Sequence, residues 1–215
     1  MCIRDRCSRG DIEQGFAEAD LVLERCYHTG IVHQGYLEPQ VCLASPEPMG
    51  GMTIYTSTQG PRTIHKDVAR LLDLPHSSIN VVPMTVGGGF GGKHGLLEPL
   101  AVAVALEMKA PVKLELSRTE DFMTSMPAPA ARVWLKMGVR KDGAICAIQA
   151  EIDIDNGVYA AASWCELLAR LLASGYKTPN LKIDCREVLT HNPMAGPYRA
   201  PTAQTASFAM ESHMD

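Results

Sequence analysis

Apolar and polar residues alternate in several stretches of this chain, and this period of two predicts β-strands. The alternating stretches are 21–29, 39–47 and 52–58, and further strands are expected at 79–86, 111–117 and 181–190. The sequence Pro-Met-Gly-Gly at 48–51 predicts a hairpin turn, and residues 132–157 predict a long hairpin around Asp142 and Gly143. Pro83 lies inside one of the predicted strands, so that strand is expected at a sheet edge or at a bulge.

Helical spacing of apolar residues separates these strands. Residues 61–74 place apolar side chains three or four positions apart, and Pro61 is tolerated in the first turn of a helix. Further helices are expected at 10–20, 96–109, 118–125, 164–174 and from Thr205 onward. The pattern predicts an α+β fold with mixed sheets, long hairpins and packed helices, rather than a regular βαβ repeat.

The two ends of the chain differ from the rest. Residues 1–9 show no periodicity, so we expect them to be unstructured or to be an artefact of sequence assembly, with the domain formed by 10–215. The last predicted helix reaches Asp215 without a capping signal. We therefore expect a fragment of a longer protein, truncated at its C-terminus.

Composition narrows the class of protein. The chain has 215 residues, of which 46% are hydrophobic and 20% charged, as in soluble globular proteins. A net charge of −4, with no cluster of Lys and Arg among aromatics, argues against nucleic-acid binding. No apolar run approaches the roughly 20 residues that cross a bilayer, and no signal peptide is visible, so we expect a cytoplasmic protein and no membrane partner.

The seven cysteines are scattered and show neither a C-x-x-C motif nor zinc-ligand spacing. This pattern predicts free thiols in a reducing compartment, and it predicts no metal site built from protein ligands.

The densest chemical signal is the glycine-rich stretch 86–95, in which six of ten residues are glycine. Gly87, Gly89 and Gly92 fit the dinucleotide-binding pattern G-x-G-x-x-G, and 87–93 also fit G-x-x-x-x-G-K. Both matches are weak, because the preceding strand contains Pro83 and because His94 stands where the second motif requires Ser or Thr. A plain tight turn needs one or two glycines, so six suggest that the backbone approaches another group closely.

Four longer motifs, taken together, resemble the molybdenum-binding subunit of the xanthine dehydrogenase and aldehyde oxidase family of molybdenum hydroxylases. They are HQGYLEPQVCLA (33–44), YTSTQGPRTIHKDVARLLDLP (55–75), VGGGFGGKHG (86–95) and GPYRAPTAQTASFAMESHMD (196–215). Their order and spacing make the resemblance specific. It covers residues 10–215 and implies that this segment is part of the molybdopterin-binding domain.

The resemblance also implies which residues bind the cofactor. In the family, backbone N–H groups of the glycine-rich loop donate to oxygens around the metal, which assigns Gly88, Gly89, Phe90 and Gly91 to this role. Gln59 matches a glutamine that binds an oxygen at the molybdenum. A cap on the helix that starts at Pro61 is the alternative role for Gln59.

Two further positions bear on the cofactor and the substrate. Arg199 matches an arginine in a second loop near the cofactor, and convergence of Gln59, 87–92 and Arg199 on one face is expected. Ala200 replaces the cysteine that carbon monoxide dehydrogenases of the family use. His94 replaces a substrate-binding glutamate of purine-oxidising members, so xanthine is not the expected substrate. His94 either contacts an aromatic or heterocyclic acid or lines the pocket, and the sequence leaves both roles open.

The resemblance implies an oxidoreductase that hydroxylates an aldehyde or an N-heterocycle, with oxygen from water. The implied cofactor is molybdopterin with molybdenum, in the cytosine dinucleotide form of bacterial members. Iron–sulfur and FAD subunits are the implied partners, and the catalytic glutamate is expected beyond Asp215, so no catalytic residue is expected in this fragment. Two alternatives remain at this point, a nucleotide-binding enzyme that uses the glycine-rich loop and a non-catalytic scaffold of the same fold.

Overall fold

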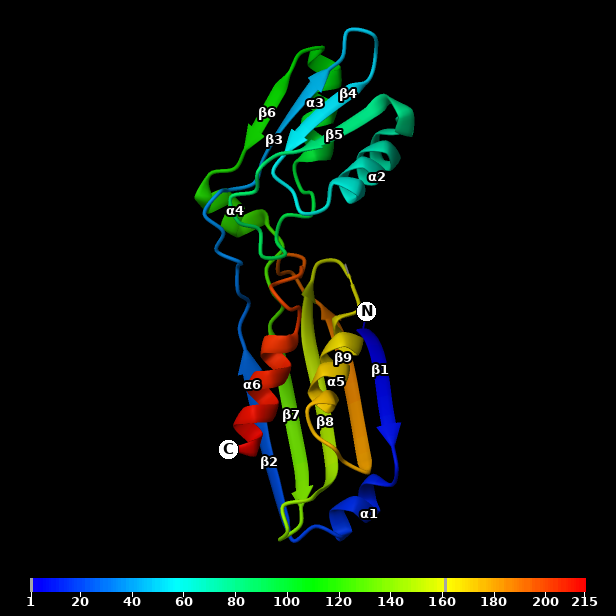
Figure 1. Ribbon diagram of the computed structural model, residues 1–215, viewed down its shortest axis with the longest axis vertical. Helices are drawn as coiled ribbons and strands as arrows, with labels where there is room; N and C mark the ends of the chain where they lie inside the picture. The colour runs from blue at the N-terminus through cyan, green and yellow to red at the C-terminus, as the bar shows by residue number, and fades with distance from the viewer. Residues whose placement is uncertain (1, 161) are drawn as a thin grey trace. The chain divides into compact units, whose positions relative to one another are not determined.

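The computed structural model describes residues 2–160 and 162–215 (Figure 1). The chain divides into two compact units. Unit 1 combines the N-terminal stretch up to Val32 with Met126–Asp215, and unit 2 is His33–Ser125. Unit 2 is therefore inserted into unit 1, and the chain passes between the units twice.

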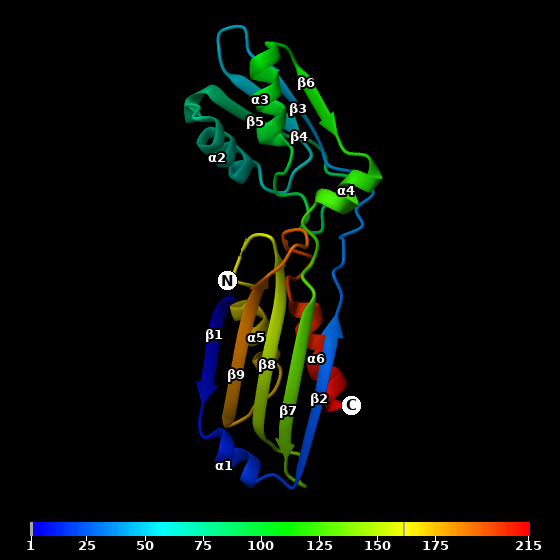
Figure 2. The same cartoon turned by 180° about the vertical axis from the view of Figure 1, so that it is seen from behind.

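Unit 1 is built on a five-stranded sheet with the strand order β1-β9-β8-β7-β2. The strands are β1 (Cys2–Arg9), β2 (Leu21–Thr29), β7 (Ala131–Val139), β8 (Ile145–Gly157) and β9 (Asn180–Leu189). The helices are α1 (Ile12–Ala17), α5 (Trp164–Ser174) and α6 (Ala203–Met214). Figure 1 shows α5 and α6 across one face of the sheet, and Figure 2 shows the opposite face, which these helices do not cover.

The core of unit 1 lies between this sheet and helices α5 and α6. Ile152 and Ile154 of β8 are buried, as are Leu168 and Leu172 of α5. The predicted hairpin is confirmed, because β7 and β8 pair antiparallel. β9 lies parallel to β8, with α5 in the connection between them.

The prediction that residues 1–9 lack structure is wrong for the described part of that stretch. Cys2–Arg9 form β1, which pairs antiparallel with β9 along its whole length. An edge strand is held by backbone hydrogen bonds to one neighbour, so it does not need the apolar alternation on which the prediction relied. The folded part of the chain therefore begins before residue 10.

Unit 2 contains a four-stranded sheet with the strand order β5-β4-β3-β6. Its strands are β3 (Val41–Pro46), β4 (Met52–Thr56), β5 (Ile79–Pro83) and β6 (Val112–Glu115). Its helices are α2 (Pro61–Leu72), the short 3₁₀ helix η1 (His76–Ser78), α3 (Glu98–Met108) and α4 (Arg118–Thr124). The strand that ends at Pro83 is an edge strand, as its proline predicts.

The core of unit 2 is formed by the sheet and by helices α2 and α3. Ile54 of β4, Val68 of α2 and Val102 of α3 are completely buried. α3 is apolar on most of its surface, but it buries only the face that carries Ala101, Val102 and Ala105, and Leu100, Leu106 and Met108 are exposed. This core fixes the ends of β4 and β5. The segment with Gln59 follows β4, and the glycine-rich stretch 86–95 follows β5.

The fold class expected from the sequence, α+β with mixed sheets and packed helices, is confirmed. The six cysteines whose side chains the structure describes are all free thiols. No helix among the described residues is long and apolar enough to span a bilayer.

Candidate functional site

The glycine-rich stretch forms an irregular turn between β5 and α3. Four of its residues have positive φ angles: Gly88 at 95°, Phe90 at 49°, Gly91 at 98° and Gly95 at 104°. Three of these are glycine, which adopts such angles without steric strain, whereas Phe90 adopts a left-handed conformation that is uncommon for a bulky side chain. The Phe90 side chain is 47% exposed, so burial does not stabilise this conformation.

Three backbone donors of the turn have no hydrogen-bond partner in the part of the chain that the structure describes. The N–H groups of Gly88, Gly89 and Phe90 donate to no acceptor among the described residues. The N–H of Gly91 differs, because it donates to Oε1 of Gln59 at 2.9 Å, and Gly92 donates to the carbonyl of Gly89 at 2.7 Å. Successive backbone amides without an acceptor in such a turn suit an anionic group.

Gln59 lies directly against this turn. Its Oε1 accepts from the N–H groups of Gly91 and Lys93, at 2.9 and 3.4 Å. Its own backbone N–H donates to the Lys93 carbonyl at 2.7 Å. With Oε1 engaged, the amide NH₂ of this exposed side chain is the end that remains for a ligand. The alternative role as a helix cap is wrong, since Gly60 is the N-cap of α2 and no side chain caps that end.

The spacing of the glycines follows from close packing inside unit 2. A Cβ on Gly87 would lie 2.5 Å from the Cβ of Glu38, and a Cβ on Gly89 would lie 2.4 Å from Oε1 of Gln59. A Cβ on Gly92 would lie 2.8 Å from the ring of Tyr36. These contacts account for all three positions of the G-x-G-x-x-G pattern without a nucleotide.

An ion pair between the buried Lys93 and the partly exposed Glu38 joins the two ends of the turn. Lys93 is fully buried, and its Nζ donates to Oε2 of Glu38 at 2.6 Å and to Oγ of Ser57 at 3.2 Å. The same Oε2 accepts from the N–H of Gly87 at 2.8 Å and from the Ser57 hydroxyl. Burial acts to raise the pKa of Glu38, but the bonds from Lys93, Ser57 and Gly87 outweigh it and hold the pKa below its ordinary value.

Tyr36 packs against the turn on the side of Gly88 and Gly92. Its side chain is 1% exposed, its hydroxyl donates to Oδ1 of Asp121 at 2.8 Å, and burial together with that bond raises its pKa to about 12. Gln40 donates through Nε2 both to this hydroxyl at 3.0 Å and to the Gly92 carbonyl at 2.8 Å. Asp121 is also paired with Arg118 at 2.9 Å. The underside of the turn is therefore fixed by buried, satisfied polar groups.

The geometry does not support a nucleotide-phosphate site. In both nucleotide motifs the glycine loop leads directly into a helix whose N-terminus binds the phosphate. Here α3 begins at Glu98, well after Gly92, and Glu98 itself occupies the helix start. Its buried carboxylate accepts from the N–H of Leu96 at 2.9 Å and from the hydroxyl of Thr56 at 2.6 Å. A phosphate would have to displace this carboxylate.

The remaining predicted site residues lie in two places. His94 follows the turn in unit 2 and is partly buried. It lies beside Gly60, because a Cβ added to Gly60 would lie 3.1 Å from Nδ1 of His94. Arg199 belongs to unit 1, in the exposed loop that precedes α6, and its carbonyl accepts a bond from the Gln204 amide. Ala200 and Thr202 of this loop have φ angles of 54° and 59°. The structure thus brings together Gln59 and residues 87–92, while Arg199 lies in the other unit.

Lys93 is a site residue that the sequence patterns did not predict. A lysine is seldom buried, and its position in a glycine-rich turn suggested an exposed residue. A signal was nevertheless present, because Glu38 directly precedes the predicted strand 39–47, and a carboxylate buried there would need a cationic partner.

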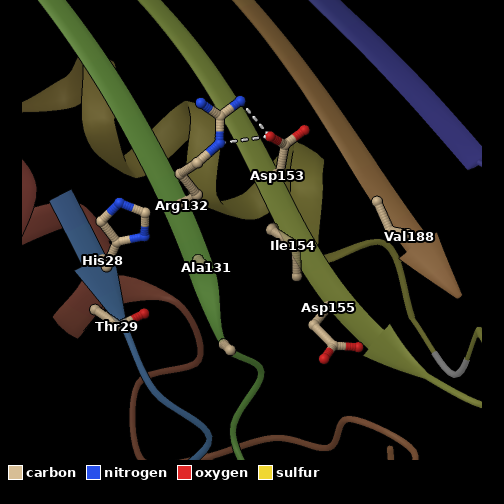
Figure 3. A pocket seen from close by; sticks show the side chains of 9 residues that line it. His28, Thr29, Ala131, Arg132, Asp153, Ile154, Asp155 and Val188 are labelled. Atoms are coloured by element: carbon tan, nitrogen blue, oxygen red, sulfur yellow. Dashed lines mark hydrogen bonds and ion pairs between the residues drawn. The ribbon is translucent and has the colours of Figure 1, made fainter. Parts of the chain in front are cut away.

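Unit 1 contains a pocket of about 290 Å³ on its sheet, lined in part by His28, Arg132, Asp153 and Asp155 (Figure 3). Asp153 accepts from Arg132 Nε at 2.8 Å and from Arg186 Nε at 2.6 Å. Burial acts to raise the pKa of Asp153, but these guanidinium groups outweigh it and lower the pKa. Both carboxylates of this pocket, Asp153 and Asp155, therefore already accept hydrogen bonds from neighbouring side chains.

Comparison with known proteins places this geometry in a family. A family model described as "Molybdopterin cofactor-binding domain" matches residues 2–215. Among curated proteins, the chain is 32% identical over 209 residues to the "Nicotinate dehydrogenase large molybdopterin subunit" of Eubacterium barkeri. It is also 31% identical over 216 aligned residues to the "Xanthine dehydrogenase molybdenum-binding subunit" of Escherichia coli O157:H7. These alignments include 96% and 97% of this chain but 49% and 28% of the two relatives, so the chain spans half of their length or less.

Solved structures agree on the fold. The aldehyde oxidoreductase of Desulfovibrio gigas superposes with a TM-score of 0.89 at 24% identity, over 97% of this chain and 23% of that one. The reconstituted CO dehydrogenase of Oligotropha carboxidovorans superposes with a TM-score of 0.87 at 26% identity, over 97% of this chain and 28% of that one.

Proposed function

This chain belongs to the molybdopterin cofactor-binding domain family, and we propose that its unit 2 binds the metal end of a molybdenum–pterin cofactor in a hydroxylase. The intact enzyme would oxidise a C–H bond of an aldehyde or an N-heterocycle and take the oxygen from water. The proposal concerns the longer protein, of which this chain is a part.

One observation carries the proposal, namely the free N–H groups of Gly88, Gly89 and Phe90 beside the amide of Gln59. All of these groups are hydrogen-bond donors, and among the described residues no cluster of three or more His, Cys, Asp or Glu could bind a bare metal ion. A surface made only of donors fits a metal that carries anionic oxygen or sulfur atoms of its own. The residues present therefore fit a molybdenum cofactor better than they fit a simple metal ion.

The cofactor supplies a centre that accepts two electrons from the substrate. The residues of this chain bind and orient it. The three amides of the turn and the Gln59 NH₂ would donate hydrogen bonds to its oxygen atoms. Because these donors are fixed before the cofactor binds, they stabilise negative charge without reorganising during the reaction. Gly91 is excluded from this set, since its N–H is already bound to Gln59.

The rest of the site would come from other parts of the protein. We propose that Arg199 contributes from the loop before α6 and that a glutamate beyond Asp215 acts as the catalytic base. We further propose a cytosine dinucleotide form of the pterin, iron–sulfur and FAD subunits as electron acceptors, and a cytoplasmic location. The word "subunit" in the names of both curated relatives supports assembly with further chains.

His94 is the proposed substrate contact. It follows the turn directly and is only partly buried, so one face of its ring can contact a molecule bound above the turn. An imidazole can donate a hydrogen bond to a carboxylate on an aromatic ring, whereas it cannot replace a carboxylate that pairs with a purine. We therefore propose an aromatic or heterocyclic acid as the preferred substrate, and xanthine as a poor one.

The test is metal and pterin analysis of the full-length protein purified from its native host. We expect about one molybdenum and one pterin per chain, followed by activity on N-heterocyclic acids or aldehydes. Folded protein without molybdenum from a host that produces other active molybdenum hydroxylases would refute the proposal and favour a non-catalytic scaffold of the same fold. Bound ATP or NAD would favour the nucleotide alternative, which the start of α3 at Glu98 opposes.

A further inference from the structure

The contacts beneath the glycine turn indicate that two residues outside the donor set determine its shape. Oε2 of Glu38 accepts from Gly87 at the start of the turn and from Nζ of Lys93 at its end, at 2.8 and 2.6 Å. The backbone N–H of Glu38 also donates to the Gly87 carbonyl at 3.1 Å. One carboxylate thus joins both ends of the turn, and the free amides of Gly88, Gly89 and Phe90 lie between them.

Lys93 connects the same carboxylate to Gln59. Its backbone carbonyl accepts from the Gln59 N–H at 2.7 Å, and its backbone N–H donates to Oε1 of Gln59 at 3.4 Å. A shift of the Lys93 main chain would therefore move both the turn and the side chain that completes the donor set. The Nζ of Lys93 also lies 5.0 Å from the centre of the Tyr36 ring, which is a favourable cation–π position.

The burial of Lys93 means that its ammonium group depends on its partners within the protein. An ammonium group that is completely buried is tolerated only when a partner neutralises it and accepts its hydrogen bonds. Glu38 is 33% exposed, so water reaches the carboxylate but not the ammonium group.

We propose that Glu38 and Lys93 are positioning residues that hold the glycine turn and Gln59 in the geometry required to bind the cofactor. This inference rests on the proposed function of the turn. Neither side chain is part of the donor surface. They act through the backbone of Gly87 and Lys93 and through the side chain of Gln59.

The test uses the full-length protein from its native host and compares Lys93→Met, Glu38→Gln and the double variant. Each single variant leaves a buried group without its partner and is expected to lower the melting temperature. The double variant removes both charges, so it is expected to recover much of that stability. The matched control is Lys113→Met, which breaks the exposed pair between Lys113 and Glu115 in the same unit.

Two measurements besides activity separate a positioning role from a purely structural one. The first is the molybdenum and pterin content of each variant. The second is hydrogen exchange of a peptide that covers 86–95, which includes the bonded amides of Gly87, Gly91 and Lys93. For the double variant we expect stability near that of the wild type, at least tenfold faster exchange in this peptide, and at least a tenfold lower cofactor content.

The outcomes are distinct for the two proposals. A wild-type protein without molybdenum overturns the proposed function. A wild-type protein with full molybdenum content, together with a folded double variant that retains the same content and the same exchange rates, overturns the positioning role alone. If the single variants fail to fold, the double variant and the Lys113→Met control still decide the question.

Discussion

Gly89→Ala is the substitution that most directly tests whether the turn acts through Gln59. The new Cβ would lie 2.4 Å from Oε1 and 2.7 Å from Cδ of Gln59, whereas an ordinary contact begins near 3.4 Å. The carboxamide must therefore move by about 1 Å, which breaks its bonds to the N–H groups of Gly91 and Lys93. Gly89 does not have a positive φ angle, so alanine fits the backbone conformation itself.

The effects on stability and on function are expected to differ in size. Loss of two hydrogen bonds by an exposed side chain costs about 1–2 kcal/mol, and the lower entropy of the unfolded chain with alanine returns about 0.4–1 kcal/mol. The free energy of unfolding should therefore fall by about 1 kcal/mol. A misplacement of about 1 Å in a group that orients the reacting centre can lower kcat by about 100-fold.

The assay measures kcat, molybdenum content and urea denaturation of the full-length protein with Gly89→Ala, Gln59→Ala and both changes together. If alanine acts by displacing Gln59, the double variant should have the same kcat and molybdenum content as Gln59→Ala alone. Gly175→Ala is the control, since a Cβ there would meet no atom within 4 Å. Additive losses in the double variant, or loss of more than about 3 kcal/mol of stability in Gly89→Ala, would refute this reasoning.

Three further predictions follow from the same contacts. Tyr36→Phe removes the hydroxyl that binds the buried Asp121, so urea denaturation should show a loss of about 1–3 kcal/mol. The folded-state pKa of Glu38 lies below its ordinary value of 4.5, so its stabilising effect is present above that pH and is lost as the pH falls through the folded-state pKa. Thermal unfolding between pH 3 and 5 should therefore depend less on pH in Glu38→Gln than in the wild type. Gly157→Ala places a Cβ 2.0 Å from the Pro193 carbonyl oxygen at a φ of 70°, and circular dichroism should show destabilisation by at least about 2 kcal/mol.

Periodicity predicted most helices and strands, because each of them buries one regular face. The long hairpin around Asp142 and Gly143 and the edge strand that ends at Pro83 both follow from local residues. Strand β1 did not, because a charged edge strand is held by backbone pairing with β9, a segment far along the chain. The division into two units has a local signal at one boundary, because Pro127 and Pro129 follow Ser125, but Val32 and His33 have no comparable linker.

For the candidate site, the sequence predicted which residues take part but not how they are bonded to each other. Motif resemblance selected Gln59 and the glycine turn, and the structure places them in contact. It did not show that Gly91 is already bonded, because that depends on the rotamer of Gln59. The partnership of Glu38 and Lys93 joins residues 55 positions apart, and only tertiary packing defines it.

The insertion of unit 2 into unit 1 affects how the chain folds during synthesis. Residues 33–125 can form their own core as soon as they leave the ribosome, because both sheet and helices of unit 2 lie within that range. Strand β1 instead waits for β9, since Cys2 pairs with Val188. At about 5–20 residues per second this delay is roughly 10–40 s. During this delay β1 stays unpaired, whereas unit 2 is complete once residue 125 is made and β2 can pair with β7 once residue 139 is made. A chaperone that shields strand edges would therefore protect β1 most.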